Sequence, residues 1–340
     1  MAPSKTITII GASGFIGSHL VPSLLQNAER QVRLLVHQRR PAGLPGSDRV
    51  QLVEANLLDK KSLKGLIRSG DTVINLAYLS GASPTDNIQA VENLAQACRS
   101  AGDTRIVHCS TAVVAGSTPA DLVDEMTPCV PTTTYELTKL AIERTLLNSA
   151  VTEVSVLRPT AVFGSGGRNL LSLAQSINHP GRFATFLKRS LHGNRRMNAV
   201  GVGNVIAALE FLIRTDIHVD REIFIVSDDE YAENNYSDIE QWLCDYFSDS
   251  KGTWYAERSP QPPLLKGGRL LPSFPVPRQL LSGLLWMARR SNTNPNRIYD
   301  GSKLLRAGFV KPFGFEQSLA DFADWFRLQY PIPQLAGLTP

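Results

Sequence analysis

The segment "TIIGASGFIG", residues 8–17, places three glycines at intervals of three residues. A β-rich apolar run ends at Ile10, and a helical pattern starts at Phe15. Glycine allows a tight turn and a close approach of the backbone to a pyrophosphate, and a helix N-terminus offers free N–H groups. A turn that uses glycine only for packing is the alternative, but the order strand, turn, helix favours dinucleotide binding. The expected cofactor contacts in this turn are Gly11, Ser13, Gly14, Phe15, Ile16 and Gly17.

Strand-like and helix-like segments alternate beyond this turn, which predicts a parallel sheet covered on both faces, a Rossmann-like doubly wound α/β fold. The expected strands are 6–10, 32–36, 50–56, 71–77, 105–111 and 154–160, and the expected helices are 15–28, 57–69, 87–102 and 135–149.

The alternation loosens after residue 165, where helical runs surround a single clear strand at 222–228. We therefore expect a dinucleotide-binding domain over 1–165 and a smaller C-terminal substrate-binding lobe over 166–335, partly interleaved with the first domain. The apolar segment 280–290 is too short to span a bilayer and is predicted to be a buried helix.

Composition excludes several classes of protein. The chain has 340 residues, and its 35 basic and 31 acidic residues leave a net charge of +4, too weak to argue for a nucleic-acid partner. Its 4 cysteines form no CxxC pair, which suits a reducing compartment and predicts no metal site. Because no signal peptide or membrane-spanning segment is evident, we expect a cytoplasmic enzyme.

A tyrosine and a lysine lie four residues apart in "YELTK", residues 135–139. On the expected helix Tyr135 and Lys139 share one face, and a neighbouring lysine lowers the pKa of a phenol from its reference value of about 10. Such a phenol can exchange a proton with a substrate near neutral pH. Upstream, Ser110 and Thr111 end an expected strand, where ligands bind in open α/β sheets. A solvated surface pair is the alternative, but the neighbouring hydroxyls and the glycine turn favour catalysis.

These motifs together resemble the extended short-chain dehydrogenase/reductase family, in its nucleotide-sugar epimerase and reductase branch. The resemblance covers nearly the whole chain. Its matching segments are "TIIGASGFIG" (8–17), "VINLA" (73–77), Asn87, "RIVHCSTAVVAG" (105–116), "DEMTPCVPTTTYELTK" (124–139), "LRPTAVFGSGG" (157–167) and "SKLLRAGFVKPFGFEQSLADFADWF" (302–326).

The resemblance implies a catalytic triad of Thr111, Tyr135 and Lys139, with Thr111 preferred to Ser110 when Gly116 is aligned. Tyr135 would act as acid or base, Thr111 would position the substrate oxygen, and Lys139 would bind the nicotinamide ribose and tune Tyr135. The resemblance also implies a homodimer through the helices 87–102 and 135–149. The further cofactor contacts that it implies are Asn56, Leu57, Leu76, Ala77, Pro159 and Val162.

Three positions depart from the family pattern. Asn56 stands where an aspartate commonly contacts adenine, Ala115 where a tyrosine often follows the strand, and Gly203 where an aspartate is usual. These departures weaken the assignment of a substrate and leave the triad intact.

The family's reactions include ketone reduction, epimerisation and dehydration. Ala112 and Val113 follow Thr111 where the family's dehydratases carry an Asp-Glu pair, which argues against dehydration. The segment 193–206 resembles part of the sugar 4-ketoreductase pattern, and Arg195 or Arg196 could clamp a substrate diphosphate. A solvated basic loop is the alternative for either arginine. We therefore expect a reductase of a nucleotide-linked 4-keto-6-deoxysugar.

Three other functions stay open. They are a nucleotide-sugar 4-epimerase with bound NAD, an enzyme of the same superfamily that acts on a steroid or flavonoid ketone, and a cofactor-binding protein that senses without catalysing. The intact set of Thr111, Tyr135 and Lys139 favours an enzyme over a sensor.

The loop after the second expected strand points to the type of cofactor. His37 lies 20 residues beyond Gly17, where this fold places an acid for the ribose hydroxyl of NAD or an arginine for the 2′-phosphate of NADP. His37, Arg39 and Arg40 give the loop a basic character, and guanidinium pairs with phosphate in a bidentate fork. NADP(H) is therefore the expected cofactor, with NAD(H) possible. A solvated basic loop that contacts no cofactor is the alternative.

Overall fold

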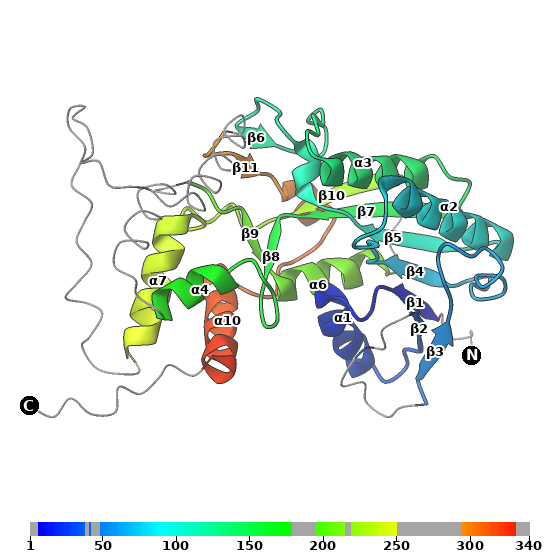
Figure 1. The fold of residues 1–340 in the computed structure, drawn as a ribbon, viewed down its shortest axis with the longest axis horizontal. Helices are drawn as coiled ribbons and strands as arrows, with labels where there is room; N and C mark the ends of the chain where they lie inside the picture. The colour runs from blue at the N-terminus through cyan, green and yellow to red at the C-terminus, as the bar shows by residue number, and fades with distance from the viewer. Residues whose placement is uncertain are drawn as a thin grey trace, which may run out of the picture.

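A seven-stranded sheet forms the centre of the molecule (Figure 1). The computed structural model describes residues 6–37, 41, 48–178, 195–214, 219–249 and 294–330. The strand order is β10-β7-β5-β4-β1-β2-β3, and every neighbouring pair is parallel. The strands are β1 (Ile7–Ile10), β2 (Val32–Val36), β3 (Val50–Glu54), β4 (Thr72–Asn75), β5 (Arg105–Cys109), β7 (Glu153–Pro159) and β10 (Glu222–Val226). The predicted Rossmann-like fold is confirmed.

Helices cover both faces of the sheet, as its apolar strands require. The helices α1 (Phe15–Gln26) and α6 (Val202–Leu212) pack on one face, and α2 (Pro84–Ala101) and α3 (Thr134–Leu147) lie side by side on the other (Figure 1). Strand side chains alternate between these faces, so Val107 packs towards α1 and Ile106 towards α2 and α3.

One expected helix is wrong. Residues 57–69 form successive turns without a regular α-helix. The Oδ1 atom of Asn56 accepts from the Leu58 amide, and Oδ1 of Asp59 accepts from the Lys61 amide. These local side-chain bonds offer the backbone an alternative to helix, and Gly65 adopts a φ of +75° that interrupts any helix begun before it.

The second half of the chain contributes to the sheet and to a separate cluster. Strand β10 joins the main sheet at its edge, while β8 (Ala161–Phe163) pairs with β9 (Ala199–Gly201). Around them pack α4 (Leu171–Asn178), α7 (Tyr236–Asp249) and α10 (Phe315–Gln329), with Phe163, Phe322 and Phe326 fully buried. The strands β6 (Leu122–Val123) and β11 (Ile298–Tyr299) form another small pair, and α9 (Ser302–Arg306) follows. The predicted buried helix at 280–290 lies outside the described residues.

The turn between β1 and α1 works because its glycines lack side chains. Gly11 has a φ of +85°, and a Cβ atom there would lie 3.0 Å from the Ala77 amide nitrogen. A Cβ atom on Gly17 would lie 2.5 Å from the Gly11 carbonyl oxygen and 2.6 Å from Cα of Ala12. The helix can therefore start directly behind its own turn only when residue 17 is glycine.

Replacing Gly17 should destabilise the turn because the added methyl group meets backbone atoms that cannot rotate away. We expect Gly17→Ala to lower the free energy of unfolding by about 1–3 kcal/mol, measured by urea denaturation. Gly314→Ala is the control, since a Cβ atom at Gly314 meets nothing within 4 Å. Equal losses in the two variants would show that the packing of Gly17 is not the constraint.

Candidate active site

Several of the residues predicted to bind cofactor and substrate follow the carboxyl ends of the central strands. The glycine turn follows β1, Leu76 and Ala77 follow β4, Thr111 follows β5, and Pro159 ends β7. Strand β1 lies between β2 and β4. The chain therefore adds β2 and β3 on one side of β1 and the later strands on the other, and the order of strands switches beside the glycine turn. Ligands of open α/β sheets bind at this switch point.

The segment after β4 packs directly on the glycine turn. The Leu76 amide donates to the Ile10 carbonyl at 2.9 Å, and the Ala77 amide donates to Oδ1 of Asn75 at 3.1 Å. Because Gly11 leaves no side chain between them, the two segments form one continuous backbone surface. Asn56 and Leu57 follow the carboxyl end of β3, where the Leu57 carbonyl accepts from Nδ2 of Asn93 at 2.8 Å.

The start of α1 is open to an anion. Gly14 caps the helix and provides no side-chain hydrogen bond, and the first turn contains no acidic residue. The first amides of a helix have no partner inside it and attract negative charge. The glycine cradle and these amides therefore fit the pyrophosphate of a dinucleotide.

The helix α3 presents Tyr135 and Lys139 towards the end of β5. Thr133 and Glu136 form a capping box that fixes the first turn of this helix. Tyr135, in that turn, is 42% exposed, whereas Lys139, one turn later, is buried and donates from Nζ to the Cys109 carbonyl at 3.1 Å. Tyr135 can thus meet a substrate, while Lys139 is fixed against the end of β5.

The pKa of Tyr135 differs from the sequence-based expectation. Burial raises its pKa to about 12, and the neighbouring Cys109 and Tyr78 side chains add to the rise. The Tyr78 ring lies 5.1 Å from the Tyr135 ring, centroid to centroid, and Nζ of Lys139 donates to a backbone carbonyl. Tyr135 is therefore protonated at neutral pH, the state of a proton donor.

The two hydroxyl residues after β5 have different surroundings. Oγ1 of Thr111 accepts from the Val113 amide at 3.4 Å and caps the short 3-10 helix η1 (Ala112–Ala115). The Ser110 hydroxyl is buried and has no hydrogen-bond partner among the described residues. Thr111 is the less buried of the two, which agrees with its predicted contact to substrate.

The segment after β7 packs against the start of α1. Pro159 is buried at the end of β7, and Val162 lies half-buried in β8. A Cβ atom on Gly167 would lie 2.8 Å from the Phe15 ring, and Nε2 of His19 bonds the Ser165 carbonyl at 2.8 Å. This loop is therefore held on the first turn of α1.

Arg196 is engaged by the turn that follows β10. It donates from Nη1 to the Ala232 carbonyl at 3.0 Å and from Nη2 to the Asp229 carbonyl, and its guanidinium lies 3.8 Å from the Asp229 carboxylate. These contacts fix the turn after β10. Arg195 is half-buried next to it.

Of the three basic residues predicted to select the cofactor, His37 is described, and it is exposed directly after β2. Arg39 and Arg40 lie outside the described residues.

Sequence reasoning missed a set of buried polar residues under α3. Glu143 and Arg158 form a buried ion pair at 2.6 Å, and His108 is fully buried in β5 beside Lys139. The signal in the sequence was a polar residue inside an apolar strand, His108 in β5 and Arg158 in β7. Such a residue does not reveal which side chain pairs with it.

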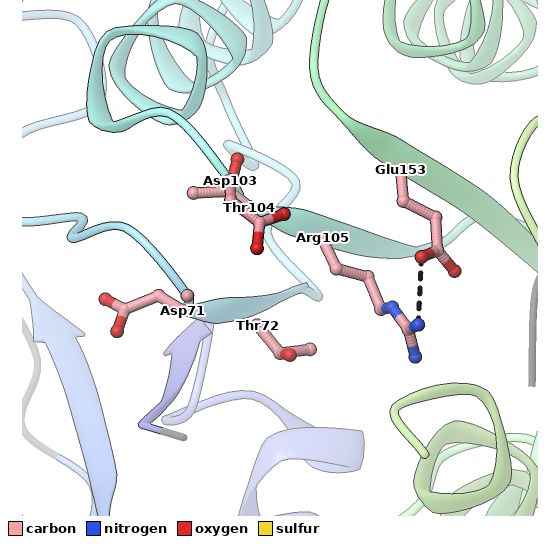
Figure 2. A pocket seen from close by; sticks show the side chains of 7 residues that line it. Asp71, Thr72, Asp103, Thr104, Arg105 and Glu153 are labelled. Atoms are coloured by element: carbon pink, nitrogen blue, oxygen red, sulfur yellow. Dashed lines mark ion pairs between the residues drawn. The ribbon is translucent and has the colours of Figure 1, made fainter. Parts of the chain in front are cut away.

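The cavity in Figure 2 lies at the opposite edge of the sheet. It surrounds the amino ends of β4, β5 and β7, where Arg105 and Glu153 form an ion pair at 2.9 Å. Because ligands of this fold bind at the carboxyl ends of the strands, this cavity is not the candidate site.

The described ranges of the chain contain no group of three or more His, Cys, Asp or Glu residues arranged to hold a metal ion. Within the same ranges, no helix has the length and apolarity that crossing a membrane requires.

Comparison with known proteins agrees with this geometry. Residues 7–227 match the model of the NAD dependent epimerase/dehydratase family. Sterol demethylase protein B of Methylococcus capsulatus is 24% identical over 347 residues, covering 95% of this chain and 98% of that protein. UDP-D-apiose/UDP-D-xylose synthase 1 of Arabidopsis thaliana is 33% identical over 129 residues, 33% of each chain.

Among solved structures, the Bordetella bronchiseptica enzyme WbmG in complex with NAD superimposes with a TM-score of 0.69 at 17% identity. The match covers 97% of this chain and 96% of that one, and it shows a shared fold. The family match spans most of the chain, from β1 to the end of β10. The chain therefore belongs to the NAD dependent epimerase/dehydratase family and is an enzyme of the extended short-chain dehydrogenase/reductase type.

Proposed function

We propose that this enzyme is an NADP(H)-dependent reductase that converts a nucleotide-linked 4-keto-6-deoxysugar to the corresponding alcohol. The observation that carries the proposal is the placement of Tyr135, Lys139 and Thr111 around the carboxyl end of β5, beside the glycine cradle. These are the groups that hydride transfer to a ketone requires from the protein.

Each side chain has a distinct part in this reaction. The bound cofactor supplies the hydride. Tyr135, protonated at neutral pH, donates its phenolic proton to the substrate oxygen, which Thr111 holds in place. Lys139 holds the nicotinamide ribose. Its positive charge also stabilises the phenolate that Tyr135 becomes when it donates its proton.

The relatives support a sugar substrate in part. The Arabidopsis synthase acts, by its name, on UDP-linked sugars, and its similarity to this chain is local. With the Arg196 guanidinium engaged by the 229–232 turn, Arg195 is the better candidate of the two to contact a substrate diphosphate.

A second candidate substrate is a sterol ketone, favoured by two observations. The full-length relative from Methylococcus is named a sterol demethylase protein. In addition, Val113, two residues after Thr111, has an apolar side chain that is 37% exposed. Large exposed apolar side chains beside a catalytic group suit an apolar substrate.

Turnover with defined ketones tests the proposed function. We expect the purified enzyme to oxidise NADPH when given a nucleotide-linked 4-keto-6-deoxysugar, followed by absorbance at about 340 nm. Tyr135→Phe should lower kcat by about 10²–10⁴-fold because the proton donor is removed. Leu137→Ala, on the same helix, should retain cofactor binding and serves as the folding control.

The outcomes separate the hypotheses. Full turnover by Tyr135→Phe would contradict the assigned proton donor. Turnover of a 3-keto sterol without turnover of any nucleotide sugar would establish the second candidate. Tight NADPH binding with neither substrate turned over would support the sensor.

The proposed preference for NADP(H) rests on the basic loop after β2. This strand ends at Val36, so the following residues start at the carboxyl edge of the sheet, next to the glycine turn. The neighbour WbmG was solved with NAD, which makes NAD(H) the alternative cofactor.

Removing both arginines of the loop tests this preference. We expect Arg39→Ala with Arg40→Ala to weaken NADPH binding about tenfold or more, since charge-assisted hydrogen bonds to the phosphate are lost, with little effect on NADH. Lys64→Ala with Arg68→Ala removes the same charge from exposed positions and is the matched control. An unchanged ratio of the two dissociation constants, measured by fluorescence titration, would exclude the loop as the selector.

A further inference from the structure

Two buried polar side chains beneath α3, those of Asn75 and His108, have no part in the proposed reaction. Asn75 in β4 and His108 in β5 are directly opposite each other in the parallel ladder. Both are buried, Asn75 at 1% exposed and His108 at 0%, and both point to the face covered by α2 and α3. Lys139 reaches the same region from α3 and is 3% exposed.

The hydrogen bonds assign the tautomer of His108. Its Nδ1 atom bonds the Asn75 backbone carbonyl at 3.2 Å, and a carbonyl can only accept, so Nδ1 carries the hydrogen. Burial and the nearby Lys139 ammonium hold the pKa of His108 well below its usual value of 6.5, so the ring is neutral. Nε2 is therefore a buried acceptor with a free lone pair.

Asn75 and Lys139 each keep an unused hydrogen-bond donor, which complements the unused acceptor of His108. Oδ1 of Asn75 accepts from the Ala77 amide, which fixes Nδ2 as the free donor of that side chain. Among the described residues, neither Nδ2 of Asn75 nor Nε2 of His108 has a hydrogen-bond partner. Lys139 has three ammonium hydrogens, and the bond to the Cys109 carbonyl uses one.

We propose that one buried water binds at this point, accepts from Nδ2 of Asn75 and Nζ of Lys139, and donates to Nε2 of His108. Unpaired buried polar groups are costly, and a buried water with three such partners has the usual number of bonds. His108 is then a positioning residue, because through this water it holds the Lys139 ammonium at the ribose side of the site. The role of Lys139 in this step rests on the proposed function.

The charge on Lys139 depends on groups from every element around it. Burial lowers the pKa of Lys139, and the nearby Cys109 on β5 and Glu143 on α3 oppose this fall only in part. The Tyr78 ring after β4 lies 5.8 Å from Nζ, Tyr135 lies one turn earlier on α3, and Arg158 on β7 is neutralised by Glu143. An acceptor supplied through the water at His108 would stabilise the ammonium further.

Substitution of His108 tests its role through the pH dependence of cofactor binding. We expect NADPH affinity of the wild-type enzyme to fall at alkaline pH as Lys139 loses its proton. His108→Leu should move this fall about one pH unit lower, because the ammonium loses its water-held anchor. His108→Gln can place an amide oxygen near the position of Nε2 and should restore the wild-type profile. Ser155→Ala removes a buried hydroxyl that also lacks a described partner, on the other face of the sheet, and should change nothing.

Two outcomes overturn the proposal. One is a folded His108→Leu variant with the wild-type pH profile. The other is a high-resolution crystal structure of the wild-type enzyme without a water in bonding distance of Nδ2 of Asn75 and Nε2 of His108, a result independent of whether any variant folds. Failure of the wild-type enzyme to bind either dinucleotide would instead contradict the proposed function, and the crystallographic test would still stand.

Discussion

The close approach of the glycine turn to its own helix and to the end of β4 is the constraint on which the site depends. A side chain at Gly17 would overlap the Gly11 carbonyl, and one at Gly11 would meet the backbone of Leu76 and Ala77. The absence of these side chains lets α1 begin directly at the carboxyl end of β1. The loop from Gly164 to Gly167 packs on Phe15 in the first turn of this helix.

A second organising feature is the polar face of α3. Tyr135, Lys139 and Glu143 are spaced at four-residue intervals, so one face of the helix carries the exposed proton donor, the buried lysine and the buried ion pair with Arg158. Breaking such a buried pair by removing one partner typically costs about 3–5 kcal/mol. The bidentate geometry of Glu143 and Arg158 ties α3 to β7 and fixes where Lys139 meets the end of β5.

Much of this could be predicted from the sequence, because the decisive signals are local. The glycine spacing, the alternation of apolar strands with helices, and the four-residue interval between Tyr135 and Lys139 are all read within short windows. The errors arose where another local rule or a distant partner dominated. Asx turns at Asn56 and Asp59 replaced the helix expected over 57–69. Burial raises the pKa of Tyr135, where the adjacent lysine alone predicted a fall. The contacts of Arg196 with the turn around Asp229, 33 positions along the chain, have no local signal in the sequence.

We propose that the dinucleotide binds at the carboxyl ends of β1, β4, β5 and β7, with its nicotinamide between Tyr135 and Pro159. A crystal structure of the enzyme with NADP(H) or NAD(H) would show whether it does. We predict that the pyrophosphate contacts the amides between Ser13 and Ile16 and that the nicotinamide ribose contacts Nζ of Lys139. A dinucleotide bound elsewhere, for example at the amino-edge cavity of Arg105 and Glu153, would contradict the account.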